Sequence, residues 1–356
     1  MKILEYNKDK GILELLIEVP EDLYYLFLIL EKGDLAYSWT TRQLKFEGTK
    51  GESRKGERVK VYLGIRVEGI EYHKFTKKVR VKGVIIEGPE KIHSKGSYHT
   101  FSVGIGSKLR IIKDKISPYH EKILELASSK IKRTLVISIG DDEVALGIIR
   151  PQGIELISTW AISPIKDENS KSINEMYLKP LKKVIDKILD YIKREKIEIV
   201  ILASISLLEK LCKDLMVKFL PKRVKLFFVT VSEGGRAGIY EILRRNDLKY
   251  LFKDVRGLYE RENIESLLLN IAKGDKKVAV GIKEILIALQ AGNVKQIILV
   301  DDLLFSDSKN EIIKVLEKVL KMKGDILIIP GDTEHGSKIK KIGGAIARLY
   351  YPLELY

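Results

Sequence analysis

Cysteine is almost absent from this sequence, because Cys212 is the single thiol in 356 residues. One thiol excludes a disulfide framework and a thiolate-rich zinc site, and it suits a reducing compartment. Proline is also scarce, at nine residues, and 45% of the chain is hydrophobic. This composition excludes a proline-rich linker protein and a largely disordered chain. The sequence therefore predicts folded domains with hydrophobic cores.

Long hydrophobic runs are missing as well. The longest one, Leu23 to Leu30, has eight residues, whereas a membrane span needs roughly 18. The first five residues reach an acidic side chain, Glu5, before any apolar run begins, which is not the pattern of a signal peptide. We therefore expect a cytoplasmic protein with no membrane segment. A chain of this length has room for two or three domains.

Acidic residues are too few to balance the basic ones, 49 against 64, so the formal net charge is +15. Residues 1–130 carry 25 basic and 18 acidic side chains, residues 131–258 carry 24 and 17, and residues 259–356 carry 15 and 14. A lysine- and glutamate-rich surface of the thermophilic kind would explain the abundance of charge but not its imbalance. The first two segments are therefore predicted to contact a polyanion such as a nucleic acid.

Residues 1–130 have mostly β patterns. Apolar residues from Val59 to Val67 alternate with polar ones, as in a half-buried strand. Similar short strands are expected near 79–85, 101–105 and 109–113, and one early helix is expected from Glu21 to Glu31. This pattern favours a small β-barrel. The basic, glycine-rich loop from Gly48 to Arg58 is either a solvated hairpin tip or an RNA contact.

The rest of the chain changes to α/β patterns. Three antiparallel strands are expected at 135–139, 144–149 and 154–161, followed by alternating helices and strands, which resembles the ribonuclease-H-like topology. Residues 259–356 alternate again and predict an α/β/α sandwich. We expect domain boundaries in the polar stretch at 127–130 and near residues 254–259. The expected fold class is therefore a multidomain chain with α+β and α/β parts.

No specific catalytic motif stands out from the residues alone. The sequence has no phosphate-binding loop, no nucleophile elbow and no HExxH motif. Asp141-Asp142 and Asp301-Asp302 are paired acids at expected strand ends, where a divalent metal could bind. The same residues are equally ordinary in turns. Composition and spacing therefore do not assign a reaction.

A series of short motifs nevertheless follows a fixed order along the whole chain. In the first segment these are Ile17–Tyr24, Gly33-Asp34, Thr41-Arg42, Val67–Tyr72, Arg80–Gly83 and Gly96–Phe101, in the middle segment Val229–Gly235 and Gly238–Leu243, and in the last segment Ala279–Ile285, Ala291–Val294 and Gly343–Tyr350. Their order resembles the Pelota family, the ribosome-rescue paralogues of the archaeal and eukaryotic class-1 release factor. The lack of a eukaryote-type acidic tail favours an archaeal member.

The resemblance implies three domains. Residues 1–130 would form an Sm-like β-barrel, residues 131–258 a ribonuclease-H-like domain, and residues 259–356 an α/β/α domain like those of kink-turn-binding ribosomal proteins. The implied function is ribosome rescue and mRNA surveillance, in no-go and non-stop decay. Such a factor recognises stalled ribosomes with an empty A site, together with a GTPase of the elongation factor 1-alpha type. An ABC-type recycling ATPase then helps it to separate the subunits, and we expect the protein to act as a monomer.

The middle segment departs from its relatives at two places. Release factors hydrolyse peptidyl-tRNA with a Gly-Gly-Gln loop, but the corresponding connection here, Ile162–Ser170, has no such tripeptide. We therefore do not expect this chain to be a peptidyl-tRNA hydrolase. Ser204–Leu207 also stands where the family usually has a Pro-Gly-Phe turn, so the backbone offered to the GTPase differs here.

The family resemblance also suggests RNA-binding residues. In the family, the loop that matches Gly48–Arg58 points into the decoding centre. Its basic side chains would pair with phosphates rather than with base edges. The predicted RNA-binding residues are Arg42, Lys50, Arg54, Lys55 and Arg58.

The alternative function is a metal-dependent endoribonuclease that cleaves stalled mRNA. Such an activity has been attributed to the N-terminal domain of archaeal members, with a divalent metal cation as cofactor. By position, Glu21 and Asp22 would be both its catalytic residues and its metal ligands. Acids that follow Pro20 at the start of a helix are also expected simply to offset the helix dipole. The two interpretations remain open from the sequence.

Overall fold

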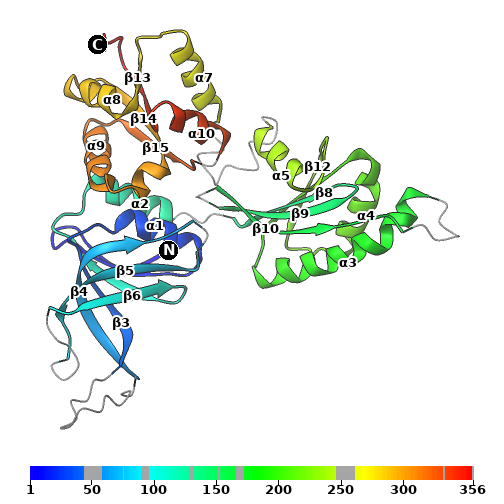
Figure 1. Ribbon diagram of the computed structural model, residues 1–356, viewed down its shortest axis with the longest axis horizontal. Coiled ribbons are helices and arrows are strands. Elements are labelled where there is room, and N and C mark those ends of the chain that lie inside the picture. Colours follow the sequence, from blue (N-terminus) through cyan, green and yellow to red (C-terminus); the bar gives the residue numbers. More distant parts are fainter. Residues whose placement is uncertain are drawn as a thin grey trace, which may run out of the picture. The chain divides into compact units, whose positions relative to one another are not determined.

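The chain is described here from a computed structural model, which covers residues 1–43, 58–74, 76–89, 96–128, 132–150, 153–165, 172–245, 261–331 and 333–354. It divides into two compact units (Figure 1). Unit 1 comprises Met1–Ser129, Asn270–Gly331 and Gly336–Tyr356, and unit 2 comprises Lys130–Leu269 and Asp332–His335. Unit 1 therefore contains both the N-terminal and the C-terminal segments of the chain. The domain boundaries expected near residues 130 and 258, and the loop residues Lys50, Arg54 and Lys55, lie outside the described residues.

The N-terminal part of unit 1 is a seven-stranded antiparallel sheet with strand order β1-β2-β7-β3-β4-β5-β6. Its strands are β1 (Lys2–Asn7), β2 (Ile12–Leu16), β3 (Leu35–Gln43), β4 (Arg58–Glu71), β5 (Lys78–Glu87), β6 (Tyr98–Gly104) and β7 (Lys108–Ile112). In β4, Val61, Leu63 and Ile65 are buried, whereas Lys60, Tyr62 and Arg66 are exposed. The period of two in the sequence thus separates a core face from an outer face.

Helix α1 (Glu21–Ile29) packs on β5 of this sheet and on α2 (Pro118–Ser128), and both helices contribute to the core of unit 1. The eight-residue apolar run of the sequence lies almost wholly in α1. All nine residues of α1 are buried, because the helix is covered on every side. A helix that is apolar all round belongs in a core. The run that is too short for a membrane is therefore the central helix of unit 1.

The C-terminal part of unit 1 is built on a four-stranded sheet with order β13-β16-β14-β15. The strands are β13 (Val278–Val280), β14 (Val294–Val300), β15 (Asp325–Ile329) and β16 (Ala345–Leu349), and two helices, α8 (Gly281–Gln290) and α9 (Lys309–Lys321), lie wholly in this unit. Helix α7 (Arg261–Ala272) belongs to unit 2 up to Leu269, and α10 (Glu334–Lys341) belongs to unit 1 from Gly336 onward. A short 3-10 turn, η3 (Asp301–Phe305), follows β14. Helix α8 packs on β13, β14 and β16, and α9 packs on β14 and β15.

Buried polar and aromatic contacts hold the two parts of unit 1 together. The ammonium of Lys309, in α9, donates hydrogen bonds to the carbonyl oxygens of Phe27 and Leu30 at the end of α1, the latter at 2.8 Å. The ring of Phe27 stacks on Phe305 at a centroid distance of 4.6 Å. Lys74, which follows β4, forms an ion pair of 2.9 Å with the fully buried Asp301. The N- and C-terminal segments therefore share one core.

Unit 2 has a five-stranded sheet with order β10-β9-β8-β11-β12. Its strands are β8 (Thr134–Ile139), β9 (Glu143–Arg150), β10 (Gly153–Ala161), β11 (Ile199–Ser204) and β12 (Lys225–Thr230), and its helices are α3 (Ile173–Arg194), α4 (Glu209–Phe219) and α5 (Gly235–Arg244). Strands β8 to β10 are antiparallel, while β11 runs parallel to both β8 and β12. Three antiparallel strands followed by α/β units were predicted from the sequence.

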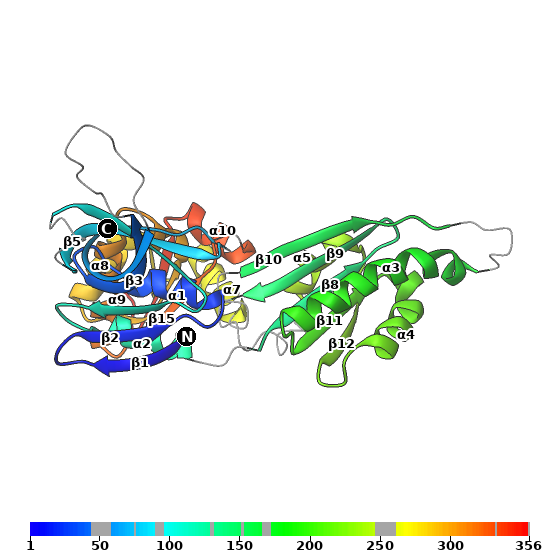
Figure 2. The ribbon, with the colours of Figure 1, turned by 90° about the horizontal axis from the view of Figure 1, so that it is seen from below.

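The helices of unit 2 lie on both faces of its sheet (Figures 1 and 2). Helices α3 and α4 enclose one hydrophobic cluster with the sheet, and α5 encloses another on the opposite face. Helix α3 begins at a capping box, in which the Ser172 hydroxyl accepts from the Glu175 amide and the Glu175 carboxylate accepts from the Ser172 amide. The multidomain, mixed α and β fold class is confirmed. Within the described ranges, no helix is long and apolar enough to cross a membrane.

Candidate nucleic-acid interface

Strands β3 and β4 form a hairpin whose outer end carries predicted RNA-binding residues. The pairing runs from Leu35 opposite Arg66 to Gln43 opposite Arg58. The connection between these strands, with Lys50, Arg54 and Lys55, lies outside the described residues. Arg58 begins β4 and is exposed. Of the predicted set, the structure thus places Arg42 and Arg58.

Arg42 is half-buried on the inner side of the hairpin. Its Nη2 donates to the Ser97 hydroxyl at 3.1 Å, and its buried Nη1 has no hydrogen-bond partner among the residues that the structure describes. Burial and the nearby Arg42 charge together lower the pKa of His99, whose Nε2 lies 3.1 Å from the Thr40 hydroxyl. One terminal nitrogen of Arg42 therefore already forms a hydrogen bond within the domain. Its role in RNA binding stays a prediction.

Arg58 and Lys60 are exposed cations on the outer face of the same hairpin. Lys60 lies opposite Thr41, and its Nζ is 5.5 Å from the centre of the Trp39 ring. Neither Arg58 nor Lys60 forms an ion pair with a described residue. The nearby Arg110, by contrast, pairs with Glu5 at 2.9 Å and with Glu14 at 3.6 Å. Among the residues that the structure describes, positive charge without an ion-pair partner thus lies at this end of the hairpin.

Glu21 and Asp22, the predicted metal ligands, lie at the start of α1 and are both buried. Asp22 Oδ2 accepts from the amides of Glu18 and Val19 at 2.7 and 3.1 Å. Its Oδ1 is 2.6 Å from the α-amino group of Met1. Because both oxygens of Asp22 already have protein partners, this carboxylate does not fit the role of a metal ligand. Cleavage of RNA by these carboxylates stays a hypothesis, and no step is derived through a metal.

The paired acids Asp301 and Asp302 are held by protein partners as well. Asp301 accepts from Lys74 and from the amide of Gly331, and Asp302 pairs with Lys340 at 2.9 Å. Burial raises the pKa of the Asp301 carboxyl against the opposing effect of Lys74. Among the described residues, no three His, Cys, Asp or Glu side chains gather closely enough to hold a metal. The acids at this strand end are contacts of the fold.

A charged cluster lines a pocket of about 260 Å³ between the loop after α1 and the segment before α2. Lys113 pairs with Asp34 at 2.7 Å and with Glu31 at 3.3 Å, and His120 Nε2 lies 2.5 Å from Glu31 Oε1. Burial of Glu31 opposes ionisation, but His120 and Lys113 outweigh it and lower the pKa of Glu31 to about 2. The charges of the cluster thus compensate one another.

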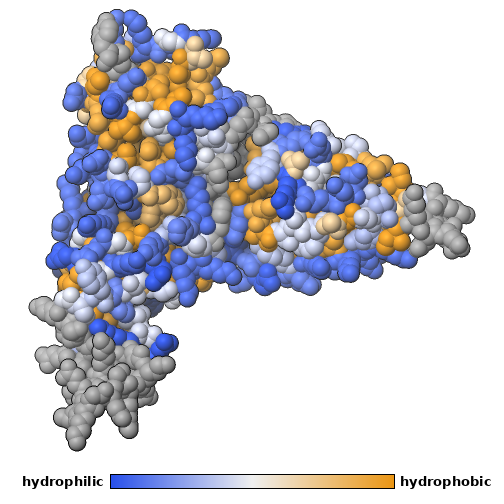
Figure 3. Space-filling model, in the orientation of Figure 1, coloured by the Kyte–Doolittle hydropathy of each residue, from blue (hydrophilic) through white to orange (hydrophobic). Residues whose placement is uncertain are grey.

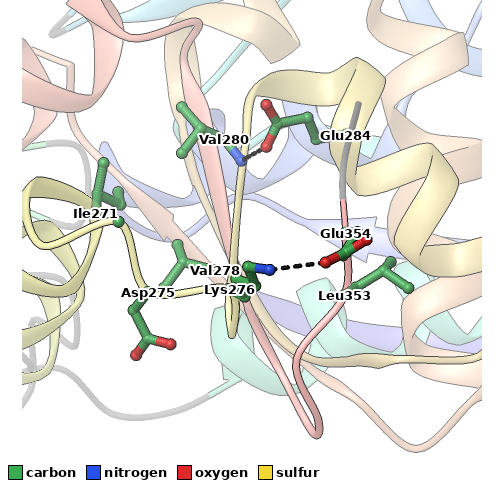
Figure 4. Close-up of a pocket in the computed structure, with 9 residues that line it drawn as sticks. Ile271, Asp275, Lys276, Val278, Val280, Glu284, Leu353 and Glu354 are labelled. Atoms are coloured by element: carbon green, nitrogen blue, oxygen red, sulfur yellow. Dashed lines mark hydrogen bonds and ion pairs between the residues drawn. The ribbon is translucent and has the colours of Figure 1, made fainter.

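A second pocket, of about 310 Å³, lies beside β13 and the first turn of α8 (Figure 4). Glu284 accepts from the Val280 amide at 2.7 Å, and Lys276 pairs with Glu354 at 2.8 Å. Figure 3 shows apolar side chains gathered over the end of unit 1 where Figure 1 draws α8 and β13. Glu284 and the Lys276–Glu354 pair are thus contacts of the fold at the edge of a surface hollow.

In unit 2, the Gly234-Gly235-Arg236 tripeptide has a structural explanation. A Cβ atom on Gly234 would lie 2.0 Å from backbone atoms of Gly140, and Gly235 has a φ of +60°. Only glycine tolerates both conditions where β8 and α5 meet. Arg236 then donates its amide to Glu143 at 3.0 Å. The tripeptide joins a strand to a helix and differs from the Gly-Gly-Gln loop of release factors.

Comparison with known families identifies the class of this chain. The Pelota N-terminal domain family matches residues 1–128, and the family described as eRF1 domain 3 matches residues 258–353. The chain is thus a relative of the class-1 translation release factors. A protein of Thermofilum pendens named "Protein pelota homolog" is 40% identical over 356 residues, which cover 99% of this chain and 100% of the relative. The chain belongs to the Pelota family, as the order of its motifs predicts.

Solved structures share the fold. The crystal structure of the Thermoplasma acidophilum Pelota protein superposes with a TM-score of 0.71 at 18% identity, over 99% of this chain and 100% of that one. Dom34 of Saccharomyces cerevisiae gives a TM-score of 0.52 at 22% identity, over 99% of both chains. That structure is described as a translation termination-like factor involved in RNA quality control pathways and interacting with Hbs1.

Proposed function

We propose that this protein rescues stalled ribosomes in the cytoplasm. It recognises a ribosome whose A site is empty, together with a GTPase of the elongation factor 1-alpha type. With an ABC-type recycling ATPase it then promotes separation of the subunits and clearance of the mRNA. The observation that carries the proposal is the match to a Pelota protein along the whole chain at 40% identity. The described role of Dom34 in RNA quality control, with Hbs1 as its partner, supports the same function.

The residues of each part agree with this role. Residues 1–130 and 131–258 hold nearly all of the excess positive charge, as a protein that lies against ribosomal RNA requires. Unit 2 has three antiparallel strands followed by parallel ones, and its Ile162–Ser170 connection has no Gly-Gly-Gln tripeptide. The chain is therefore equipped to occupy the A site and not to hydrolyse the peptidyl-tRNA ester.

A reconstituted rescue reaction tests the function. Ribosomes stalled on a truncated mRNA with labelled peptidyl-tRNA are mixed with the protein, the GTPase and the ATPase. We expect the subunits to separate while the peptide stays attached to its tRNA. Subunit separation is followed by sedimentation, and peptide release by acid precipitation, with a class-1 release factor as the positive control for hydrolysis. Peptide release by this protein alone would contradict the proposal.

The basic loop is expected to contact phosphates. The triple variant Arg54→Ala/Lys55→Ala/Arg58→Ala should bind ribosomes with an empty A site more weakly. Each lost phosphate contact should also reduce the slope of log affinity against log salt by roughly 0.7–0.9. Arg58 is exposed, so the thermal stability should change little. Binding is measured by sedimentation at several salt concentrations.

The matched control removes three exposed lysines of α9, Lys314, Lys318 and Lys321. This control lowers the net charge by the same amount without touching the hairpin. An unchanged salt slope in the loop variant, or an equal change in the control, would show that the loop is only a solvated tip. Codon identity in the A site should not alter binding, because phosphates carry no sequence information.

A further inference from the structure

The outer face of the β3–β4 hairpin carries a row of three aromatic rings. Trp39 lies directly opposite Tyr62 in the strand register, with ring centroids 5.5 Å apart and an interplanar angle of 57°. Tyr37 stacks beside Tyr62 at 6.2 Å and 24°. The Trp39 side chain is 59% exposed and that of Tyr62 is 40% exposed. The row therefore lies on the solvent side of the sheet, outside its core.

Stabilisation of the hairpin by these rings explains only part of their arrangement. A cross-strand aromatic pair does stabilise two neighbouring strands. The core of the sheet, however, is filled by the alternate residues of the same strands, such as Leu63 and Val61. An indole that needed only to brace its neighbour could lie flat against the sheet. Most of the Trp39 surface remains open to solvent instead, and large exposed aromatic surface is typical of binding sites.

The charge beside the rings indicates what binds there. Arg58 and Lys60 flank the Trp39 end of the row, are exposed and have no ion-pair partner among the described residues. The Tyr37 end is acidic instead, because Arg110 faces both Glu5 and Glu14 and the Tyr37 hydroxyl donates a hydrogen bond to Glu87. Exposed rings next to unpaired cations are the combination with which proteins hold single-stranded nucleic acid. The rings stack on bases and the cations contact the phosphates.

We propose that Trp39 and Tyr62 form a stacking platform for unpaired bases of RNA, with Lys60 and Arg58 binding the adjacent phosphates. The proposal rests on the proposed function, in which the N-terminal domain lies against RNA at the A site. It adds a contact made by the strands of the hairpin themselves rather than by the loop. Stacking accepts any base, so the platform binds single-stranded RNA without regard to sequence. A duplex hides its base faces and is not a ligand.

The sequence offers a direct spectroscopic test, because it contains only two tryptophans, Trp39 and Trp160. The variant Trp160→Phe leaves Trp39 as the single indole in the full-length protein. Titration with oligouridine should quench its fluorescence, since a base stacked on the indole contacts the ring. An oligonucleotide of equal length and charge with abasic sites should bind through its phosphates only. It should give little quenching and a lower affinity.

The affinity for oligouridine should fall roughly 5- to 100-fold in Trp39→Ala, as expected for the loss of one stacked base. Trp39→Phe keeps an aromatic face and should retain most of the affinity. The matched control is Tyr98→Ala, which removes a 72% exposed ring from β6 of the same sheet. This control should bind oligouridine like the wild type. The comparison with Trp39→Phe and the comparison with abasic RNA do not depend on the folding of Trp39→Ala. The proposal can therefore be tested even if Trp39→Ala folds poorly.

Two outcomes would overturn the platform. One is that the wild type binds oligouridine and the abasic oligonucleotide with equal affinity. The other is that Trp39→Ala binds oligouridine as tightly as the wild type. If the same variant still lost ribosome binding, the rings would instead contact a ribosomal protein. The rescue reaction separates this proposal from the function on which it rests. If the protein stacks on oligouridine but does not separate the subunits, the platform is supported and the proposed function is contradicted. If it separates the subunits but does not stack on oligouridine, the proposed function is supported and the platform is contradicted.

Discussion

Replacing Asp22 with alanine is expected to lower the stability of unit 1 by about 3–5 kcal/mol. The carboxylate is only 2% exposed and accepts two backbone hydrogen bonds, from Glu18 and Val19. It also faces the α-amino group of Met1 at 2.6 Å. Alanine would leave the two amides without this acceptor and would remove the charge partner of the Met1 amino group, which would keep only its hydrogen bond to the Ala127 carbonyl. An unmade buried hydrogen bond costs more than a made one contributes. Thermal and urea unfolding followed by circular dichroism measures the loss.

The neighbouring Glu18 supplies the control for this prediction. Its side chain is exposed, so Glu18→Ala should change the stability by less than about 0.5 kcal/mol. Asp22→Asn keeps one acceptor oxygen and should fall between the two variants. An Asp22→Ala protein as stable as the wild type would show that the amides find other acceptors. The same stability measurement is needed before an Asp22 variant is used to test the nuclease hypothesis. A loss of RNA cleavage in an unfolded variant would say nothing about catalysis.

The stability of unit 1 should rise with pH through Lys309. Complete burial lowers the pKa of Lys309 to about 7, from 10.5 in an exposed lysine. Glu31 and Asp34 raise this pKa, whereas Lys113 lowers it further, but burial is the largest influence. Between pH 7 and 10.5 the unfolded chain therefore binds more protons at this residue than the folded chain does. In that window stability increases with pH, by at most about 1.4 kcal/mol per unit, and below pH 7 the full penalty for burying the ammonium applies.

The prediction is measured as a difference between two proteins. The free energy of unfolding of the wild type minus that of Lys309→Met should grow by a few kcal/mol from pH 7 to pH 10. Subtraction cancels the titration of all other groups. The control Lys314→Met removes an exposed lysine of the same helix, and its difference from the wild type should not vary with pH. A pH-independent difference for Lys309→Met would show that the ammonium keeps an ordinary pKa in the folded state.

The fold was predictable where each element carries its own signal. The alternation around Val61 and Leu63 predicts β4, and the helical spacing of apolar residues predicts α3, because these patterns depend only on nearby residues. Strands β1, β2, β3, β13 and β16 were not predicted individually. β13 has three residues, and it exists because it pairs with β16 about 70 positions away, Val278 opposite Arg348. A strand that depends on a distant partner has little local pattern to detect.

The same reasoning applies to the site. The family resemblance pointed to the basic loop, but the aromatic row was missed, because Trp39 and Tyr62 are brought together only by the register of the hairpin. For Asp22, the sequence allowed either a metal ligand or a residue that stabilises a helix start. The decision needed the two amides of Glu18 and Val19, which point back at the carboxylate. Such contacts depend on how the chain turns before the helix, which composition does not specify.

The shared core of unit 1 also constrains the order of events during synthesis. Phe27 and the Lys309 that binds its carbonyl are 282 positions apart. At roughly 5–20 residues per second, about 10–40 s separate the end of α2 from Lys309 on the translating ribosome. During this interval unit 2 is made, while the end of α1 lacks Lys309 and the Phe27 ring, which stacks on Tyr72 of its own segment, lacks Phe305. A nascent chain released in that interval would carry an open aromatic surface of the kind that chaperones bind.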